Sequence, residues 1–406
     1  MKAYNSEDFL SKLNRIISYD KEEKINGIMD FDALEKLYIS ILRGKFHLKE
    51  RRTSVVPLKR EKMISIALDF FKSIDKEFYQ KARKVILNVD ERTNLEIVNA
   101  NNGNRKNRGH VRTFKGKSEV YVPTQIELSK NIALKDDMCT LEDLYTLVHE
   151  IAHLLDLNYK DSIPTEEDIL SKKSEKFNYK NSFTRELFAE STAISFETLL
   201  MEYLMRETDY PNLLVSQSYV RRVNDFYDMT ASLYGRLQLI KIQEKKNYID
   251  NNDLVNIAQK YNISSNYLKF ILRKIISDSN VSLTYRNRYV FAGAISPTIV
   301  KKYHEEGSNG LKDYLEAVRE DKEDEALEIL GIDMNNDGIK QVLKNVIDQD
   351  IHMLKNTDKK EKSVLNSVKE AFVENTTKDE VQRGIGRLSP DASKDIANKN
   401  SKDQKC

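Results

Sequence analysis

The sequence has few of the residues that cross-link a chain or interrupt a helix. Its 406 residues include 2 cysteines, 13 glycines and 6 prolines. The cysteines, Cys139 and Cys406, are too few and too far apart to form a disulfide framework or a thiolate zinc site, so a reducing compartment fits best. Because glycine and proline are scarce and long segments show a hydrophobic period near 3.6 residues, we predict a mostly helical architecture.

The sequence also lacks a long hydrophobic run and an excess of charge. No stretch of about 18 apolar residues occurs, and acidic residues stand among the first ten, so we expect neither a membrane span nor a signal peptide and predict a cytoplasmic protein. Lysine plus arginine (66) nearly balances aspartate plus glutamate (64), for a formal charge of +2. That balance gives no reason to expect nucleic acid or an acidic membrane as a partner.

Composition divides the chain into three parts. We expect an N-terminal lobe of amphipathic helices over residues 1–90, the main, catalytic domain over 91–355, and a polar C-terminal helix followed by a disordered tail over 356–406. The apolar content of 40% is enough to bury a sizeable core.

Local patterns place helices and one hairpin. Apolar residues at helical spacing predict helices around 33–42 and 63–71. Two short runs with strand character, 111–114 and 119–122, predict a small hairpin. They are the only clear β signal in the sequence, and we expect it to end at Pro123.

One predicted helix carries two histidines four residues apart. It opens at Thr140 with what resembles a capping box closed by Asp143. Because residues four apart share a helix face, His149 and His153 can present two imidazole nitrogens to one tetrahedral ion about 2 Å away. Glu150 lies beside them, where it can reach a metal-bound water, so the His-Glu-x-x-His pattern indicates a zinc peptidase with Glu150 as general base. Apolar residues continue the helix: Leu144, Leu147, Val148, Ile151, Ala152, Leu154 and Leu155.

A second predicted helix carries three glutamates on one face. Glu186, Glu190 and Glu197 are spaced four and seven residues apart. The usual reading of such a stripe is a solvated acidic face. A zinc site with two histidines needs a third ligand, however, and a ligand histidine needs a hydrogen-bond acceptor that fixes its tautomer. The pattern alone leaves open which glutamate fills which role. Apolar residues surround the stripe: Leu187, Phe188, Ala189, Ala193 and Ile194.

Residues 189–204 resemble the second metal-binding helix of the oligoendopeptidase F and thimet oligopeptidase family. In that helix an Ala-Glu pair, here Ala189 and Glu190, is followed seven residues on by another glutamate, here Glu197, and then by Leu-Leu and Glu-Tyr-Leu. Further similar segments extend the resemblance over about residues 115 to 345.

The resemblance implies a mainly α, zincin-like helical metallopeptidase with a small β-hairpin or sheet at the active-site cleft. One Zn²⁺ per chain would be bound by His149, His153 and Glu190. Glu197 would be the acid that supports a ligand histidine, and Glu186, which matches no family position, is kept as a second candidate for that supporting place.

The resemblance also suggests residues that meet the substrate. The strand containing Val120 and Val122 lies where the family has an edge strand that pairs with substrate backbone. Residues 289–296 are similar to the family's tyrosine-rich segment, which implies that the Tyr289 hydroxyl stabilises the tetrahedral oxyanion. The histidine that the family carries ahead of this segment is missing here, and Tyr285 is its candidate replacement.

The predicted function is zinc-dependent hydrolysis of peptide bonds in a peptide or an unfolded protein. Two alternatives stay open, a protease directed at one folded protein and a catalytically silent peptide-binding relative. The presence of Glu150 favours an active enzyme over the silent relative. No feature of the sequence indicates the oligomeric state or the residues preferred around the cut.

Overall fold

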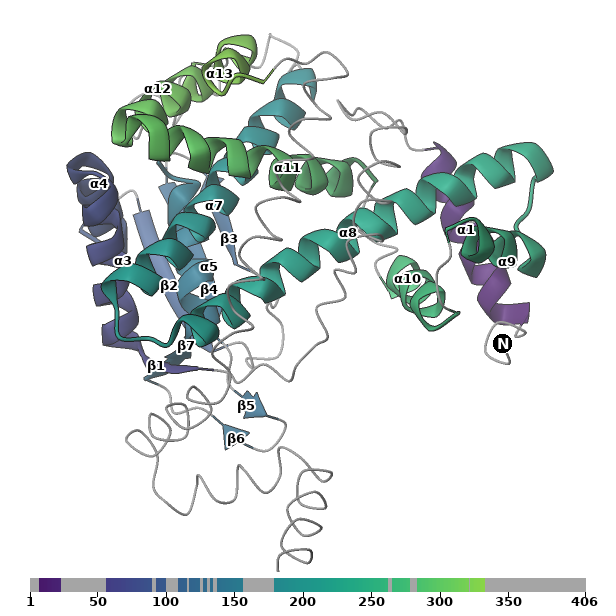
Figure 1. Ribbon diagram of the computed structural model, residues 1–406, viewed down its shortest axis with the longest axis horizontal. Coiled ribbons are helices and arrows are strands. Elements are labelled where there is room, and N and C mark those ends of the chain that lie inside the picture. The colour runs from purple at the N-terminus through teal and green to yellow at the C-terminus, as the bar shows by residue number, and fades with distance from the viewer. Residues whose placement is uncertain are drawn as a thin grey trace, which may run out of the picture. The chain divides into compact units, whose positions relative to one another are not determined.

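The structure is a computed structural model of the chain, drawn as a ribbon in Figure 1. No helix in its described part is long and apolar enough to cross a membrane. The residues described are 7–22, 56–89, 93–99, 109–114, 117–124, 127–129, 132–133, 137–155, 179–261, 265–277, 283–320 and 322–332.

A two-stranded ribbon fixes where the histidine-bearing helix begins. Strands β1 (Pro57–Lys59) and β7 (Met138–Thr140) pair antiparallel. Strand β7 runs without a loop into helix α5 (Leu141–Ala152), and β1 likewise leads directly into the next helix. The Leu141 N–H donates to the Val56 carbonyl at 3.0 Å, so the first turn of α5 is tied to the ribbon.

A three-stranded sheet lies in the same part of the chain. Its strand order is β2 (Thr93–Asn99), β4 (Lys117–Thr124), β3 (His110–Phe114), so β4 is central. Strand β2 pairs parallel to β4, and β3 pairs antiparallel to it. A further antiparallel pair consists of β5 (Glu127–Ser129) and β6 (Ile132–Ala133).

The predicted hairpin is confirmed by the pairing of β3 with β4. The expectation that this β signal ends at Pro123 is wrong. Pro123 lies within β4 opposite Val98, and the described residues include five more strands. Strands of two or three residues are too short to show the alternation of apolar and polar residues that marks a strand. Strand β2 comes directly after a polar stretch, so the sequence around it does not stand out as a buried strand.

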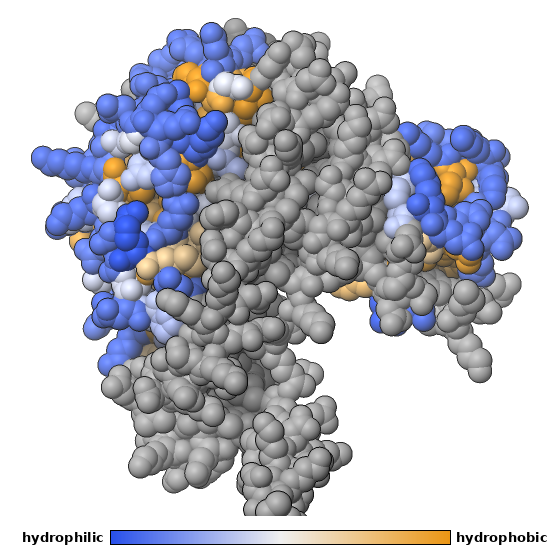
Figure 2. Space-filling model, in the orientation of Figure 1, coloured by the Kyte–Doolittle hydropathy of each residue, from blue (hydrophilic) through white to orange (hydrophobic). Residues whose placement is uncertain are grey.

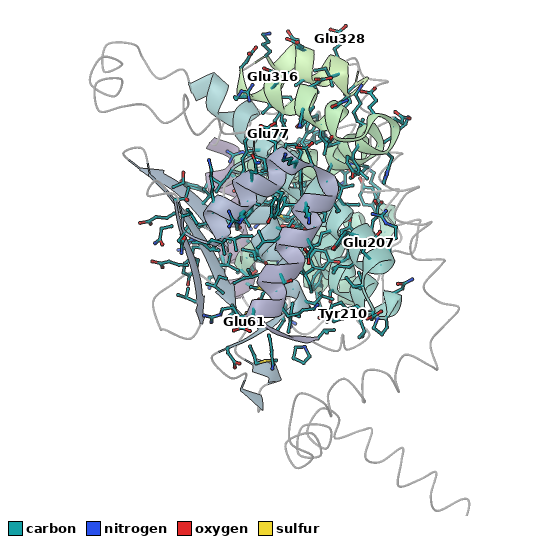
Figure 3. All side chains as sticks on the ribbon, turned by 90° about the vertical axis from the view of Figure 1, so that its left-hand side faces the viewer. Glu61, Glu77, Glu207, Tyr210, Glu316 and Glu328 are labelled. Atoms are coloured by element: carbon teal, nitrogen blue, oxygen red, sulfur yellow. The ribbon has the colours of Figure 1, made fainter. Side chains whose placement is uncertain are left out.

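Helices α3 (Arg60–Ile74) and α4 (Lys76–Ile86) pack against each other. Figure 3 shows Glu61 near the beginning of α3 and Glu77 near the beginning of α4, at opposite ends of the pair. The Asp75 side chain caps α4 by accepting from the Glu77 N–H at 2.7 Å.

The helix predicted around 63–71 is confirmed as part of α3, whereas the one predicted around 33–42 lies outside the described residues. The apolar residues of α3 occur at helical spacing because one face is buried. Its buried residues are Met63, Ile66, Ala67, Phe70, Phe71 and Ile74.

Long helices make up the rest of the described chain, and the prediction of a mainly helical fold is confirmed. Their bounds are α1 (Glu7–Glu22), α7 (Tyr179–Glu207), α8 (Asn212–Lys246), α9 (Asn251–Lys260), α10 (Ser265–Ser277), α11 (Leu283–Glu306), α12 (Ser308–Arg319) and α13 (Glu323–Ile329).

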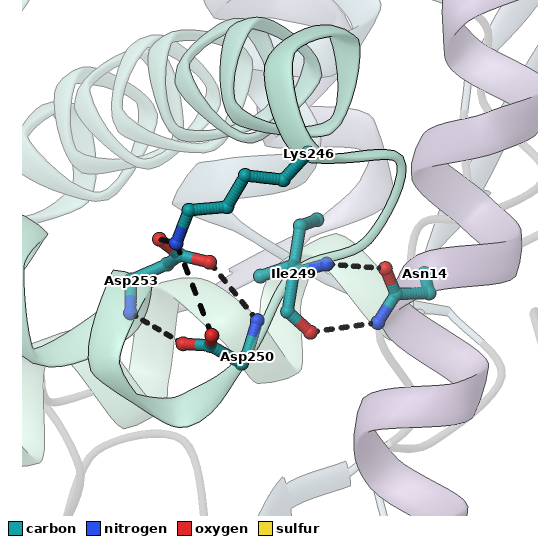
Figure 4. A network of polar contacts seen from close by, with 5 residues as sticks. All are labelled: Asn14, Lys246, Ile249, Asp250 and Asp253. Carbon is teal, nitrogen blue, oxygen red and sulfur yellow. Dashed lines mark hydrogen bonds and ion pairs between the residues drawn. The ribbon is translucent and has the colours of Figure 1, made fainter.

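Polar contacts hold the turn between α8 and α9 and join it to α1 (Figure 4). The Asp250 and Asp253 side chains each accept from the other's N–H, both at 3.0 Å, and form a capping box. Lys246 donates to Asp253 at 2.6 Å. The Asn14 amide of α1 accepts from the Ile249 N–H at 2.8 Å and donates to its carbonyl at 3.0 Å.

The described elements fall into two compact units. One contains the strands, α3, α4 and most of α5, and the other contains α1, α9 to α13 and most of α7 and α8. Both have apolar cores. On the face shown in Figure 2, most described surface residues are hydrophilic, and hydrophobic ones occupy smaller areas among them. The division at residues 90 and 355 stays a prediction.

Candidate metal centre

Helix α5 begins with the predicted capping box. The Thr140 N–H donates to Asp143 Oδ2 at 2.7 Å, and the Asp143 N–H donates to Thr140 Oγ1 at 3.2 Å. This exchange satisfies two N–H groups that a helix start leaves without partners, and confirms the sequence prediction. The helix interior is fully buried at Leu144, Leu147, Val148 and Ile151.

The helix ends earlier than its apolar run suggests. Ala152 is its last residue, and His153 begins a turn that the Leu155 N–H closes by donating to the Ala152 carbonyl at 3.0 Å. Leu154 and Leu155 remain buried in that turn. His149 therefore lies in the last turn of α5 and His153 directly after its end.

The structure brings together the three residues predicted as metal ligands. Ligand atoms of His149, His153 and Glu190 all lie within 4.8 Å of one another. The closest described approach is 3.9 Å, from His153 Nε2 to Glu190 Oε2, and these two side chains are 16% and 15% exposed. The group combines the last turn of α5 and the residue after it with a side chain from α7.

The donor set suits zinc. Two imidazoles and one carboxylate leave a fourth tetrahedral position open, the arrangement of catalytic rather than structural zinc sites. Zinc bonds of about 2.0–2.1 Å place tetrahedral ligand atoms about 3.4 Å apart, so small side-chain rotations would close the group around an ion. Soft thiolate ligands take no part, because Cys139 lies in β7 and the group holds only nitrogen and oxygen donors.

The turn of α7 before Glu190 is held by hydrogen bonds to one carbonyl. The Phe188 carbonyl accepts from Thr192 Oγ1 at 2.9 Å and from the Tyr314 hydroxyl of α12 at 3.4 Å. The Tyr314 ring also packs edge-on against the Phe188 ring, with centroids 6.3 Å apart. Sequence reasoning missed Tyr314, because it is one aromatic among many on a predicted helix and its contact spans 126 residues.

Of the other two glutamates of the stripe, only Glu197 has a side chain that the structure describes. Glu197 lies two turns after Glu190 on α7 and is buried, 3% exposed, so the reading of a solvated acidic face does not hold for it. Glu186 belongs to the first part of α7, and its side chain lies outside the described residues.

Glu150 is a buried acid on α5, 5% exposed. The residue before β3, Gly109, comes so close to it that a Cβ on Gly109 would overlap the Glu150 carboxylate. The edge of the three-stranded sheet therefore runs beside the predicted general base. No sequence pattern indicated this contact, since a glycine in a polar stretch is ordinarily a turn residue.

The two predicted tyrosines lie one turn apart on α11. Tyr289 is half-buried. Tyr285 is on the same helix, and its side chain lies outside the described residues.

The expectation that Val120 and Val122 belong to an edge strand is wrong. Both are fully buried in β4, which pairs with β2 on one side and with β3 on the other. Local sequence cannot distinguish the two strands of a hairpin by their place in a sheet, because the third strand joins from elsewhere in the chain. Within the described sheet, the edge strands are β2 and β3.

No protein-family model and no curated protein matches this sequence. Two crystal structures match the structure of this chain. One, named as a "putative peptidase" from Chlamydophila abortus, has 13% sequence identity and a TM-score of 0.51, and the match covers 86% of this chain and 55% of that chain. The other, named as a "putative oligoendopeptidase F" from Bacillus anthracis str. Ames, has 10% identity and a TM-score of 0.45 over 88% of this chain and 59% of that one.

The chain thus spans little more than half the length of either structure that it matches. Identities this low speak for the fold alone. The chain shares the fold of the first of these structures over the matched part, and its mainly helical architecture with small sheets is the predicted fold class.

Proposed function

We propose that the protein is a zinc-dependent endopeptidase, a divergent relative of the oligoendopeptidase F and thimet oligopeptidase family. The supporting observation is the convergence of His149, His153 and Glu190 beside a buried Glu150, which joins a His-Glu-x-x-His helix to an acid from a second helix. The fold shared with a structure named as a peptidase agrees with this proposal.

Zinc bound by the three ligands would polarise the scissile carbonyl and lower the pKa of an attacking water. Glu150 would accept a proton from that water and deliver it to the leaving amine. Its burial keeps the carboxylate away from bulk solvent, where charges interact more weakly.

Two further groups complete the proposed mechanism. Glu197 would accept a hydrogen bond from a ligand histidine and so fix the tautomer that binds metal. The Tyr289 hydroxyl, or that of Tyr285, would donate to the oxyanion of the tetrahedral intermediate.

The proposed substrate is an extended peptide segment that pairs with β3. This strand is at the edge of its sheet, and the residue before it touches Glu150, so backbone pairing there would bring a peptide bond near the general base. The mode requires an unfolded or loop segment, because a helix or a paired strand has no free backbone groups to offer.

The direct test is digestion of a peptide library by the wild type and by Glu150→Gln, with zinc content measured for both. We expect Glu150→Gln to retain zinc and to lose about 10²- to 10⁴-fold in rate. Glu142→Gln is the matched control, since it makes the same change on a half-buried residue of the same helix. Equal cleavage by Glu150→Gln and the wild type would refute the mechanism, and bound zinc without hydrolysis of any peptide would refute the peptidase assignment.

A further inference from the structure

Gly109 occupies a position where a side chain does not fit. The atoms nearest to a Cβ built there are Glu150 Oε1, Thr146 Cγ2 at 2.7 Å and Glu150 Cδ at 3.0 Å. Carbon atoms in ordinary contact are about 3.5–4.0 Å apart, so an alanine at 109 would overlap both neighbours. The backbone before β3 therefore packs directly on the turn of α5 that carries Glu150.

Neither neighbour can easily make room. Thr146 is β-branched, and its Oγ1 donates to the Glu142 carbonyl at 3.2 Å, which holds its methyl group toward Gly109. Glu150 has a flexible side chain but is only 5% exposed, so its carboxylate cannot simply turn out into solvent.

Position 109 requires glycine because a side chain does not fit there, and not because the backbone has a conformation that only glycine adopts. Among described glycines, Gly307 and Gly331 have positive φ angles of 66° and 65° with nothing near an added Cβ, and Gly109 is not among those with positive φ. At Gly235 in α8, an added Cβ would meet only two isoleucine side chains, at 3.3 and 3.5 Å. Among the described glycines, Gly109 is the one at which an added Cβ would come closest to a carboxylate.

We infer that Gly109 is a positioning residue for Glu150: its missing side chain lets the edge-strand backbone form a wall that holds the carboxylate in place. The inference rests on the proposed function, because the carboxylate has to be held for proton transfer. A side chain at 109 would push Glu150 from its place, while the metal ligands His149, His153 and Glu190 would keep theirs.

The test is a double-mutant cycle between Gly109→Ala and Glu150→Asp. All proteins carry Thr146→Ser, which keeps the hydroxyl and removes the Cγ2 methyl, so that Glu150 is the group that an alanine would displace. With Glu150 present, Gly109→Ala should lower kcat about 100-fold, as expected for a displacement near 1 Å, with KM and zinc content unchanged. With Glu150→Asp, the carboxylate is one methylene shorter, and Gly109→Ala should lower kcat no more than about threefold further.

Gly235→Ala is the matched control and should leave kcat unchanged. The same cycle is measured by thermal unfolding, which needs no activity: Gly109→Ala should lower the midpoint by several degrees with Glu150 present and much less with Glu150→Asp. Equal effects of Gly109→Ala in both backgrounds, in rate and in midpoint, would overturn the inference. A wild type that hydrolyses no peptide but shows a coupled unfolding cycle would refute the proposed function and leave the Gly109–Glu150 contact standing.

Discussion

At the scale of single residues, Cys139 shows how burial decides chemistry. The side chain is fully buried in β7 opposite Leu58. Burial, and to a smaller extent the nearby Asp143 carboxylate, raise the pKa of the Cys139 thiol to about 11, while Arg60 opposes both effects. The thiol is therefore protonated at neutral pH, and the thiolate needed for reaction is scarce.

We predict that Cys139 in the folded protein is nearly inert toward an aromatic disulfide reagent at pH 8. In a Cys406→Ser variant, which leaves Cys139 as the only thiol, the native protein should react at least about 100-fold more slowly than the protein in urea. The measurement is the release of the coloured thiol over time. Rapid reaction of the native variant would show that β7 does not shield the residue.

The ligand assignment can be tested one glutamate at a time. We predict that Glu190→Gln weakens zinc binding by more than the roughly 10- to 100-fold that loss of an outer hydrogen-bond partner costs, whereas Glu197→Gln stays within that range. Competition with a chromophoric chelator measures both. Glu186→Gln is the matched control from the same helix. If Glu186→Gln has the largest effect, the third ligand is Glu186 and not Glu190.

At the scale of elements, α5 depends on its first turn. We predict that Thr140→Ala, which removes the hydroxyl that caps the helix, lowers the free energy of unfolding by about 1–2 kcal/mol. Thr140→Ser keeps the oxygen and should cost much less. Urea denaturation measures both. Equal losses for the two variants would mean that the methyl group, and not the capping hydrogen bond, is what stabilises the helix start.

The turn between α8 and α9 gives a prediction about pH. Hydrogen bonds from backbone N–H groups, above all that of Asp253, and the charge of Lys246 lower the pKa of the Asp250 carboxyl below its usual value of 3.8. Because the folded pKa is depressed, the contribution to stability is present above the unfolded value and lost as pH falls through the folded one.

We therefore predict that Asp250→Ala lowers the urea midpoint at pH 7, and that its difference from the wild type shrinks as pH falls below about 4. Asn252→Ala, which removes an exposed side chain without a titratable group from the same helix, is the control, and its difference from the wild type should not change with pH. A difference that stays constant from pH 7 to pH 3 would contradict the assigned contacts.

At the scale of the whole molecule, α1 is joined to helices more than 200 residues away. A buried ion pair connects Asp20 of α1 with Arg236 of α8, with 3.1 Å between Oδ2 and Nε and side chains 3% and 0% exposed. Gln243 of α8 also donates to the Asn14 carbonyl at 3.1 Å and to Ser18 at 2.9 Å. Part of the N-terminal segment is thus integral to the unit that contains α8.

We predict that Asp20→Ala lowers the free energy of unfolding by about 3–5 kcal/mol, because it leaves the Arg236 charge buried without this partner. The double variant Asp20→Leu, Arg236→Leu should lose less than Asp20→Ala alone. Guanidinium denaturation of the three proteins gives the comparison. If the double variant is less stable than Asp20→Ala alone, the cost of leaving Arg236 without this partner is not the main reason for the loss of stability.

What the sequence could reveal depended on how local each feature is. The capping box at Thr140 and the pair of histidines at the end of α5, His149 in its last turn and His153 directly after it, follow from patterns within fifteen residues, and the structure contains them. The place of β4 inside its sheet and the contact of Gly109 with Glu150 join segments whose pairing leaves no local mark. The assignment of Glu190 as the third metal ligand lies between these cases. The stripe of glutamates indicated which helix supplies the ligand, and the family resemblance indicated which of its glutamates.

Because β7 passes directly into α5, the number of residues between Met138 and His153 determines where the two histidines point. One inserted residue at the junction would rotate the rest of the helix by about 100° and carry both histidines away from Glu190. In any relative that uses the same site, this interval should align without a gap. The site therefore depends on the number of residues in this interval as strictly as on their identity.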